Sequence, residues 1–147
     1  MSAARELINA FFDCLRNLDE EVDRCVALFA DDGVFEFPYM PTIGIDARFA
    51  GHDAIRGVLE LIRSHFSYFT LSDIDIHELK DGSGLFVEYH SDSVLKGTDR
   101  VYAQDYVTRL VVENGKIKLL REYLNIISSA RMLLPNGLAD VPEAAKA

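Results

Sequence analysis

The sequence predicts a single α+β domain in which helices pack on an antiparallel sheet. Two observations predict this class. Apolar residues recur at helical spacing as far as Phe66, and from about Phe69 the period changes from 3.6 to 2 and stays there. Runs of helices followed by runs of strands are typical of α+β proteins. The 147 residues are about one domain's worth, and we expect residues 1–134 to form the domain and residues 135–147 to form a flexible tail.

Three helices are predicted in the first half of the chain. The first begins after Ser2, which is a suitable N-cap. The second begins at Asp19 and is broken by the sequence at 31–33, and the third begins near Asp53. Their apolar stripes are Leu7, Ile8, Phe11, Phe12, Leu15 and Leu18; Val22, Cys25, Val26 and Phe29; and Ile55, Val58, Leu59, Ile62 and Phe66.

Five strands are predicted around and after these helices. Residues 34–37 form a short strand, and residues 38–51, which contain two prolines, form a loop or a broken edge hairpin. The long strands that follow are 71–79, 85–95, 101–112 and 116–127. Asn114-Gly115 is a strong hairpin signal because both positions tolerate a positive φ. From Ser128 to Leu134 the chain has room for one or two helical turns.

The composition argues against several classes of partner. The formal net charge of −9 argues against nucleic acid and against an anionic membrane surface. The N-terminus does not have the pattern of a signal peptide, and no apolar stretch approaches the ~18 residues of a membrane span. Cys14 and Cys25 fall outside any CxxC motif and are interpreted as reduced core thiols. We therefore expect a cytoplasmic protein that binds neither nucleic acid nor membranes.

The sequence also lacks the motifs of cofactor, metal and covalent chemistry. It has no glycine-rich phosphate loop, no Cys/His cluster at zinc spacing and no GxSxG nucleophile elbow. We therefore expect no cofactor and no metal site.

The last predicted strand carries the principal candidate for catalysis. Successive side chains of a strand point to opposite faces, so Glu122 shares a face with Leu120 and Leu124. Apolar neighbours desolvate a carboxyl group, which raises its pKa and suits it to proton transfer. The sequence thus predicts Glu122 as a general acid or base in a pocket. The alternative is a solvent-exposed face, or an ion pair between Glu122 and Arg109 of the neighbouring strand.

The neighbouring strands supply possible catalytic partners for Glu122. Arg109 would either hold Glu122 ionised or bind an anionic ligand. Asp105 would act as a second carboxyl group, whose pKa would separate from that of Glu122. The alternative for both residues is an ordinary cross-strand charge pair. Tyr89 or Tyr106 would donate a hydrogen bond to the ligand.

Aromatic and aliphatic side chains supply the walls of the expected hollow, which would bind a mostly apolar small molecule. The predicted ligand contacts are Phe11, Phe12, Phe37, Tyr39, Val58, Ile62, Tyr89, Tyr106, Leu120 and Leu124. On the opposite parity of the last strand, Ile117, Leu119 and Tyr123 make a face too apolar to stay exposed. We therefore expect a homodimer through the sheet.

Two segments resemble a known superfamily. Residues 29–35 followed by 51–55 resemble the opening of the SnoaL-like and nuclear transport factor 2-like superfamily. Residues 113–117 and 121–125 resemble its final hairpin. The resemblance implies a cone-shaped fold, with N-terminal helices packed on a strongly curved antiparallel sheet around a pocket. It also implies a homodimer through that sheet.

Three relatives in this superfamily bear on mechanism. The base of ketosteroid isomerase corresponds to Phe37, and its tyrosine to Phe11 or Phe12, so that enzyme's machinery is missing here. Limonene-epoxide-hydrolase-like proteins have a last-strand acid in a motif similar to residues 121–123. In the phenazine-biosynthesis A/B proteins the last-strand glutamate matches Glu122, whereas the pocket histidine of their third helix falls at Val58. The resemblance thus leaves an acid at Glu122 in an otherwise apolar hollow.

Two functions remain open from the sequence. The first is a metal- and cofactor-independent acid–base enzyme of the isomerase, cyclase, hydrolase or condensing type, which acts on a small, mostly apolar, ring-containing metabolite. The second is a non-catalytic ligand-binding or dimerisation module of the same fold.

Overall fold

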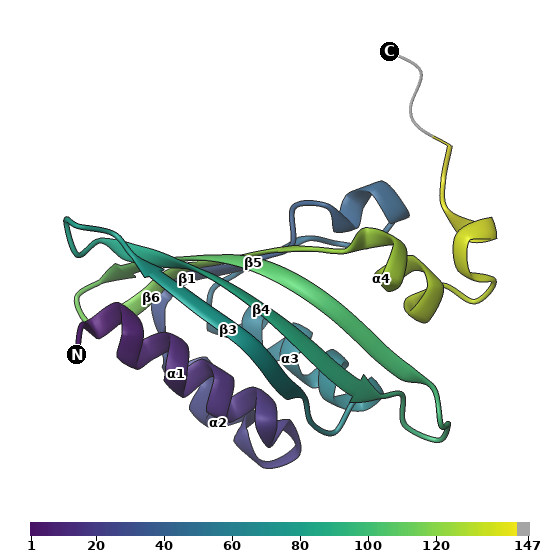
Figure 1. Cartoon of the computed structure of the whole chain (residues 1–147), viewed down its shortest axis with the longest axis horizontal. Coiled ribbons are helices and arrows are strands. Elements are labelled where there is room, and N and C mark those ends of the chain that lie inside the picture. Colours follow the sequence, from purple (N-terminus) through teal and green to yellow (C-terminus); the bar gives the residue numbers. More distant parts are fainter. Residues whose placement is uncertain (144–147) are drawn as a thin grey trace.

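Three helices form a layer under the sheet in the computed structural model, which describes residues 1–143 (Figure 1). The Ser2 side chain accepts a hydrogen bond from the Arg5 backbone N–H at 3.1 Å and so caps the first helix, as predicted. The apolar face of each helix turns toward the core. The helices are α1, Ala3–Arg16; α2, Leu18–Ala27; and α3, His52–His65.

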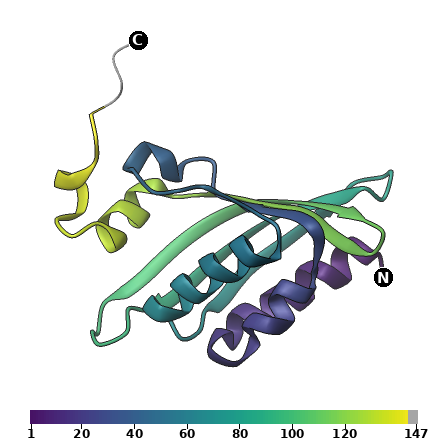
Figure 2. The ribbon, with the colours of Figure 1, turned by 180° about the vertical axis from the view of Figure 1, so that it is seen from behind.

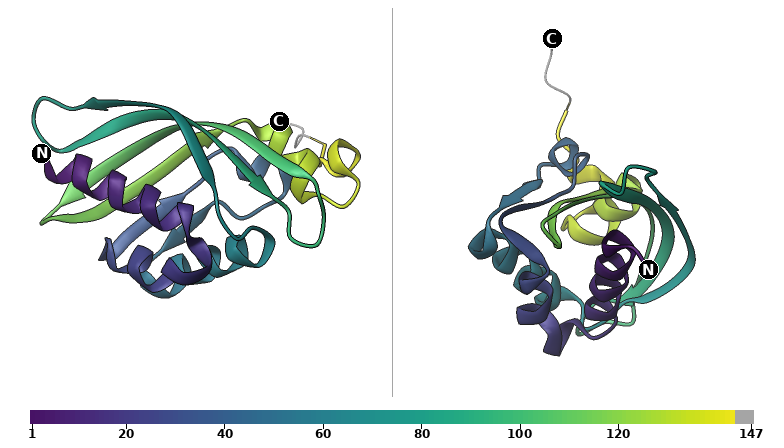
Figure 3. Two further views of the ribbon diagram at one scale, coloured as in Figure 1. Left: turned by 60° about the horizontal axis from the view of Figure 1, so that its bottom comes forward. Right: turned by 90° about the vertical axis from the view of Figure 1, so that its left-hand side faces the viewer.

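Six strands form one sheet in the order β2-β1-β6-β5-β4-β3. Their bounds are β1, Phe29–Glu36; β2, Arg48–Ala50; β3, Thr70–Glu78; β4, Gly84–Val94; β5, Val101–Glu113; and β6, Lys116–Leu124. The long strands arch over the helices (Figure 2), and the end-on view in Figure 3 shows the sheet as an arc with α1 on its concave side. The predicted α+β cone is confirmed. One detail was wrong, because β1 pairs with β6 in parallel and the sheet is therefore mixed.

The junction between α2 and β1 differs from the prediction. The helix ends at Ala27, and Phe29 already belongs to β1, where it pairs with Ile117 of β6. Phe29 is 1% exposed, so its burial is satisfied by the sheet rather than by a continued helix. The pairing shifts register before Val34, and this irregularity accommodates the polar residues 31–33 within the strand. The helical spacing of Phe29 therefore predicted the wrong element for this residue.

The segment between β1 and α3 takes the second of the two predicted forms, the broken edge hairpin. A short 3₁₀ helix, η1 (Met40–Ile43), ends at Gly44, and the chain then returns as the edge strand β2. β2 pairs antiparallel with β1, with Phe35 opposite Phe49. This returning segment brings Phe49 to the same side of the sheet as Phe37, with ring centroids 6.3 Å apart.

A bulge in β6 changes which residues face the core. Val111 pairs with Leu119 and Val112 pairs with Ile117, so Lys118 is an extra residue in β6. Ile117 is consequently fully buried, although strict alternation had placed it on the outer face with Leu119. The prediction for Ile117 was wrong because alternation cannot register an inserted residue.

The chain closes the cone with a helix after β6. The last strand ends at Leu124 rather than at residue 127, because the Asn125 side chain accepts hydrogen bonds from the backbone N–H groups of Ile127 and Ser128 and caps α4 (Ile126–Leu133). A 3₁₀ turn, η2 (Gly137–Asp140), follows within the segment predicted to be a tail. The flexibility of that tail stays a prediction, and residues 144–147 lie outside the described residues. Among residues 1–143 no helix is both long and apolar enough to cross a membrane.

Candidate functional site

A cavity of about 320 Å³ lies on the concave side of the sheet. Residues of α1, α3, α4 and all six strands contribute to its wall. Most of the lining is apolar, and the polar or ionisable members are Asp46, His65, Tyr89, Ser91, Tyr102, Tyr106 and Glu122. Asp46 and His65 are exposed. Within the described chain, Glu122 is therefore the buried carboxyl group of the cavity.

Glu122 lies in the wall of this cavity, as the alternation of β6 predicts. The residue is 5% exposed, with Leu120 and Leu124 on the same face. Its Oε1 accepts a hydrogen bond from the Tyr89 hydroxyl at 3.1 Å. Burial raises the pKa of Glu122 from 4.5 to about 8, and the hydrogen bond from Tyr89 opposes only part of that rise. The carboxyl group is therefore mostly protonated at neutral pH.

Tyr89 is held in place by two aromatic neighbours. Its ring packs edge-on against Phe12 at 4.8 Å between centroids and lies flat on Tyr106 at 4.7 Å. Burial raises the pKa of the Tyr89 hydroxyl well above its usual value, and the nearby Glu122 raises it further. Tyr89 thus stays a hydrogen-bond donor over the whole pH range in which Glu122 titrates.

Asp105 and Arg109 do not lie in the cavity. Thr108 is the residue of β5 opposite Glu122, and Arg109 is opposite Arg121 on the outer face. The predicted contacts between Glu122 and these two side chains are therefore wrong, both as catalytic partners and as an ion pair. The pattern of β5 was ambiguous because both of its parities carry apolar and polar residues. The burial of Glu122, and not a neighbouring charge, sets its pKa.

The outer face gives Asp105 and Arg109 other contacts. Asp105 Oδ1 pairs with His90 Nδ1 at 2.8 Å, and this contact, opposed by burial, raises the pKa of His90. The Arg109 guanidinium lies 6.0 Å from the centre of the Phe86 ring. Asp105 thus has a cross-strand partner on the outer face. This partner is His90 rather than an arginine or a lysine.

Most of the predicted ligand contacts do line the cavity. They are Phe11, Phe37, Val58, Ile62, Tyr89, Tyr106 and Leu124. Phe12 and Leu120 are buried but are not among the lining residues, because they pack into the core. Tyr39 is 47% exposed and packs against Tyr123 at 5.5 Å, beside a groove that also contains Asp105. The chain turns at Pro38, so Tyr39 leaves the inner face that Phe37 occupies.

The polar end of the cavity near α4 was not predicted from the sequence. The Gln104 amide donates to the Asn125 carbonyl at 3.0 Å and to Ser129 Oγ at 3.1 Å, and Tyr102 lies 2.7 Å from the same Ser129 oxygen. These bonds fasten α4 to β5. Ser91, which lines the cavity opposite Gln104, was also missed, although it shares its parity with Tyr89. The parity of β4 could have identified Ser91.

Two buried hydroxyl groups on the inner face have no partner in the described chain. They are Ser91 Oγ and Thr108 Oγ1. Buried polar atoms usually form a hydrogen bond, because an unsatisfied one costs about 1–3 kcal/mol. Thr108 lies between Val87 and Glu122 in the sheet, so its hydroxyl is close to the acid without bonding to it.

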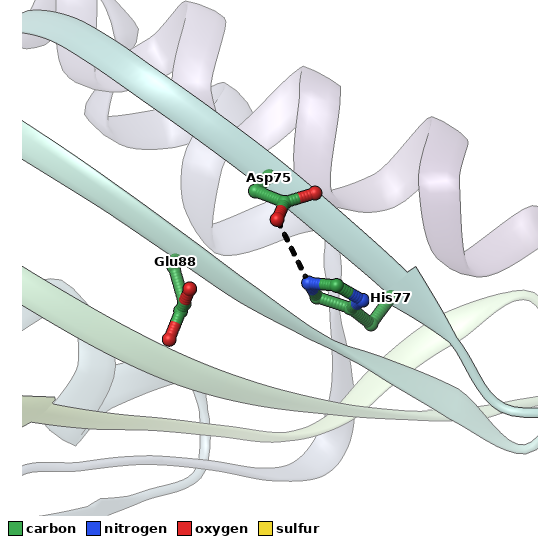
Figure 4. A group of neighbouring side chains, drawn as sticks. All are labelled: Asp75, His77 and Glu88. Atoms are coloured by element: carbon green, nitrogen blue, oxygen red, sulfur yellow. Dashed lines mark ion pairs between the residues drawn. The ribbon is translucent and has the colours of Figure 1, made fainter.

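One group of possible metal ligands lies elsewhere in the part of the chain that the structure describes. Asp75, His77 and Glu88 bring their ligand atoms within 4.8 Å of one another. Figure 4 shows the ion pair between Asp75 and His77, which is 3.0 Å long, with Glu88 on the adjacent strand. All three side chains are exposed. The residues next to them in β3 and β4, Ile76 and Val87, turn to the inner face. The group is therefore separated from the cavity by the sheet.

Comparisons with known proteins agree with this architecture. The model of the SnoaL-like domain family matches residues 8–120. An uncharacterised PhzA/B-like protein of Pseudomonas aeruginosa is 34% identical over 98 residues, which are 67% of this chain and 68% of that protein. The phenazine biosynthesis-related protein PhzB2 of the same species superimposes with a TM-score of 0.72 at 21% identity, covering 98% of this chain and 90% of that one. TerC, co-crystallised with polyporic acid, superimposes with a TM-score of 0.73 at 16% identity, covering 89% and 98%.

Proposed function

Because this chain belongs to the SnoaL-like domain family, we propose that it binds a small, mostly apolar, ring-containing metabolite and catalyses a proton transfer on it. The reaction is of the isomerase, cyclase, hydrolase or condensing type and uses side chains of the protein alone. Glu122 is the general acid, and Tyr89 is the residue that positions and stabilises it.

The observation that carries this proposal is the state of Glu122. A general acid works best when its pKa lies near the working pH, and burial brings the pKa of Glu122 to about 8. One hydrogen bond, from Tyr89 to Oε1, occupies the carboxyl group, which leaves Oε2 to meet a ligand in the cavity. An acid placed only for stability would carry a full set of partners.

The proton transfer follows from this geometry. Protonated Glu122 donates its proton to an oxygen of the ligand, such as a carbonyl oxygen, and the carboxylate that remains keeps the hydrogen bond from Tyr89. The same carboxylate then removes a proton from a carbon of the ligand, which returns Glu122 to its neutral form. The net result is a proton moved from carbon to oxygen, which is an isomerisation and requires no other reactant.

The walls of the cavity support the ligand class. Aromatic rings from α1, from β1 and from the residue that follows β1 face the cavity; they are Phe11, Phe35 and Phe37. Flat apolar rings stack favourably on such side chains. TerC, which shares the fold, was crystallised with polyporic acid, which makes a ring-containing ligand a reasonable candidate here.

The experiment that tests catalysis is the exchange Glu122→Gln, which keeps the shape and removes the ionisable proton. A panel of ring-containing ketones and enols is incubated with both proteins in deuterated water, and exchange at carbon is followed by NMR. We expect exchange with the wild type and none with the variant, while binding of the same compounds persists. Equal exchange rates in both proteins would overturn the role of Glu122.

The second candidate function is a non-catalytic binding module. It is favoured by the single buried carboxyl group, because many acid–base reactions use two carboxyl or imidazole groups, and within residues 1–143 the others that line the cavity, Asp46 and His65, are exposed. In that case ligands bind to the wild type without any exchange at carbon, and Glu122→Gln changes affinity alone.

We also propose that a second copy of this chain covers the outer face of the sheet. Phe86 and Val107 are 37% and 39% exposed there, and Arg109 Nε is buried without a partner in the described chain. Acidic side chains of β3 and β4 lie on one half of this face, and Arg109 and Arg121 lie on β5 and β6. A two-fold axis would place each half against its opposite charge.

Light scattering at micromolar concentration tests this assembly. The wild type is expected to be a dimer, and Val107→Glu is expected to be a monomer. Val101→Glu, at a 58% exposed position at the first residue of β5, is the matched control and should remain a dimer. A monomeric wild type would overturn the proposal.

A further inference from the structure

A second polar position lies in the cavity wall, at Ser91 of β4. The residue is 1% exposed and lines the cavity. Its Oγ has no hydrogen-bond partner among residues 1–143. Sheets rarely retain a buried hydroxyl in that state, because an apolar residue would be more stable at the same place. The unpaired hydroxyl indicates that its partner comes from outside the chain.

The side chains around Ser91 do not supply that partner. Gln104 is opposite Ser91 in the sheet, but its amide is already engaged with Tyr102, Asn125 and Ser129. The Tyr106 hydroxyl is the nearest candidate: its contact with Ser91 lowers the pKa of Tyr106 against the larger rise caused by burial, but the two oxygens do not meet the geometry of an ordinary hydrogen bond. Ser91 is thus free to bond to a ligand, with a tyrosine hydroxyl beside it.

The sheet register separates Ser91 from Glu122. Glu122 is level with Val87 through Thr108, and Ser91 is four residues farther along β4 than Val87. Strands lie about 4.8 Å apart and rise about 3.3 Å per residue, so the two positions would be about 16 Å apart on a flat sheet, and the curvature shortens this separation on the concave side. The stacked rings of Tyr89 and Tyr106 lie between them.

Resting on the proposed function, we infer that Ser91 binds an oxygen substituent at the end of the ligand remote from Glu122. The ligand is then an elongated compound of two or three fused rings with an oxygen at each end. Glu122 acts on the first oxygen, and Ser91 selects for the second. Ser91 is accordingly a specificity-determining residue with no part in the proton transfer.

The chain offers a matched control two residues away. Ser93 lies on the same strand and the same face and is 3% exposed, but its hydroxyl donates to the backbone carbonyl of Tyr68. Ser93 therefore holds the fold, whereas Ser91 does not. Ser93→Ala is expected to lower the melting temperature, and Ser91→Ala is expected to leave it unchanged or raise it.

The test uses two planar probes that differ by one oxygen: 2-hydroxyanthraquinone and 2,6-dihydroxyanthraquinone. Affinities are measured by calorimetry at about pH 6, where Glu122 is protonated. The wild type is expected to bind the dihydroxy probe about three- to tenfold more tightly, as one added hydrogen bond implies. Ser91→Ala should abolish that preference and leave the affinity for the monohydroxy probe unchanged, whereas Ser93→Ala should retain the preference.

The outcomes separate this inference from the function on which it rests. A wild type that binds both probes equally overturns the role of Ser91 and leaves the cavity as a ring-binding site. A loss of stability in Ser91→Ala equal to that in Ser93→Ala also overturns it, because the hydroxyl then serves the fold. A wild type that binds neither probe overturns the proposed ring-binding function together with this inference.

Discussion

The Tyr89 hydroxyl and the Glu122 carboxyl meet at 3.1 Å although they come from β4 and β6, which are not neighbours in the sheet. The tyrosine reaches across β5, and the strong curvature of the sheet makes that reach possible. This bond is the direct support of the buried acid, and its removal has a measurable effect.

We expect Tyr89→Phe to raise the pKa of Glu122 above its wild-type value. The Tyr89 hydroxyl bonds to the ionised carboxyl group and favours it, so the variant loses the one contact that opposes burial. The titration is followed by the ¹³C shift of the Glu122 carboxyl group. Tyr106→Phe is the matched control, because Tyr106 stacks on Tyr89 without bonding to Glu122. A pKa unchanged in Tyr89→Phe would contradict the assignment.

We expect Glu122→Gln to become more stable, relative to the wild type, as the pH rises. The pKa of Glu122 rises from 4.5 in the unfolded chain to about 8 in the fold. The folded protein therefore keeps a proton that the unfolded chain releases between these values, and the wild-type free energy of unfolding falls through this window. The expected gain for the variant between about pH 5 and about pH 8 is on the order of a few kcal/mol. Urea unfolding at both pH values measures it, and parallel curves would refute the burial of the acid.

We expect Gly84→Ala to destabilise the protein by roughly 2–4 kcal/mol. A Cβ at this position would lie 1.9 Å from the Leu110 carbonyl oxygen, so β4 and β5 would have to separate. Gly57→Ala provides the contrast, because a Cβ there meets nothing within 4 Å, and alanine favours the interior of α3 by up to about 1 kcal/mol. Both free energies come from urea unfolding. Equal effects would mean that the strands are not in such close contact.

We expect Ser129→Ala to loosen α4 from the sheet. The Ser129 hydroxyl bonds to both Tyr102 and Gln104, and its loss leaves buried polar atoms unsatisfied at a cost of about 1–3 kcal/mol. Hydrogen exchange should accelerate in α4 before it does in β5. The neighbouring Ser128→Ala should not accelerate exchange, because alanine is the better helix former. Similar exchange in both variants would show that α4 is held by apolar contacts alone.

The position of Glu122 could be predicted from the sequence, but its partners could not. Glu122 shares its parity with Leu120 and Leu124, and one strand's alternation suffices to turn such a carboxyl group inward. Which residue of β5 lies opposite depends on register, and both parities of β5 offered a plausible face. The sequence therefore predicts Arg109 on the cavity face, whereas it lies on the outer face.

The helical and sheet periods predicted the class and most boundaries for a similar reason. A hydrophobic period is a local property of the sequence. It predicts the wrong structure where pairing with a distant strand or an inserted residue decides which face is buried. The spacing of Phe29 fits the helix and predicts it as part of α2, whereas the residue pairs with Ile117 of β6, far along the chain. Lys118 was not recognised as a bulge because an extra residue leaves no mark in the apolar pattern.

The parallel pairing of β1 with β6 gives the chain an order of assembly. β1 is made before β2, β3, β4 and β5, yet its central neighbour is β6, so Phe29 and Phe35 lack that partner strand until β6 is made. A nascent chain that stops at residue 113 can pair β4 with β5. In that chain β2 is the one strand available to pair with β1. The cavity therefore closes only when β6 has been made, and the acid that gives it a chemical character arrives on the same strand that completes its wall.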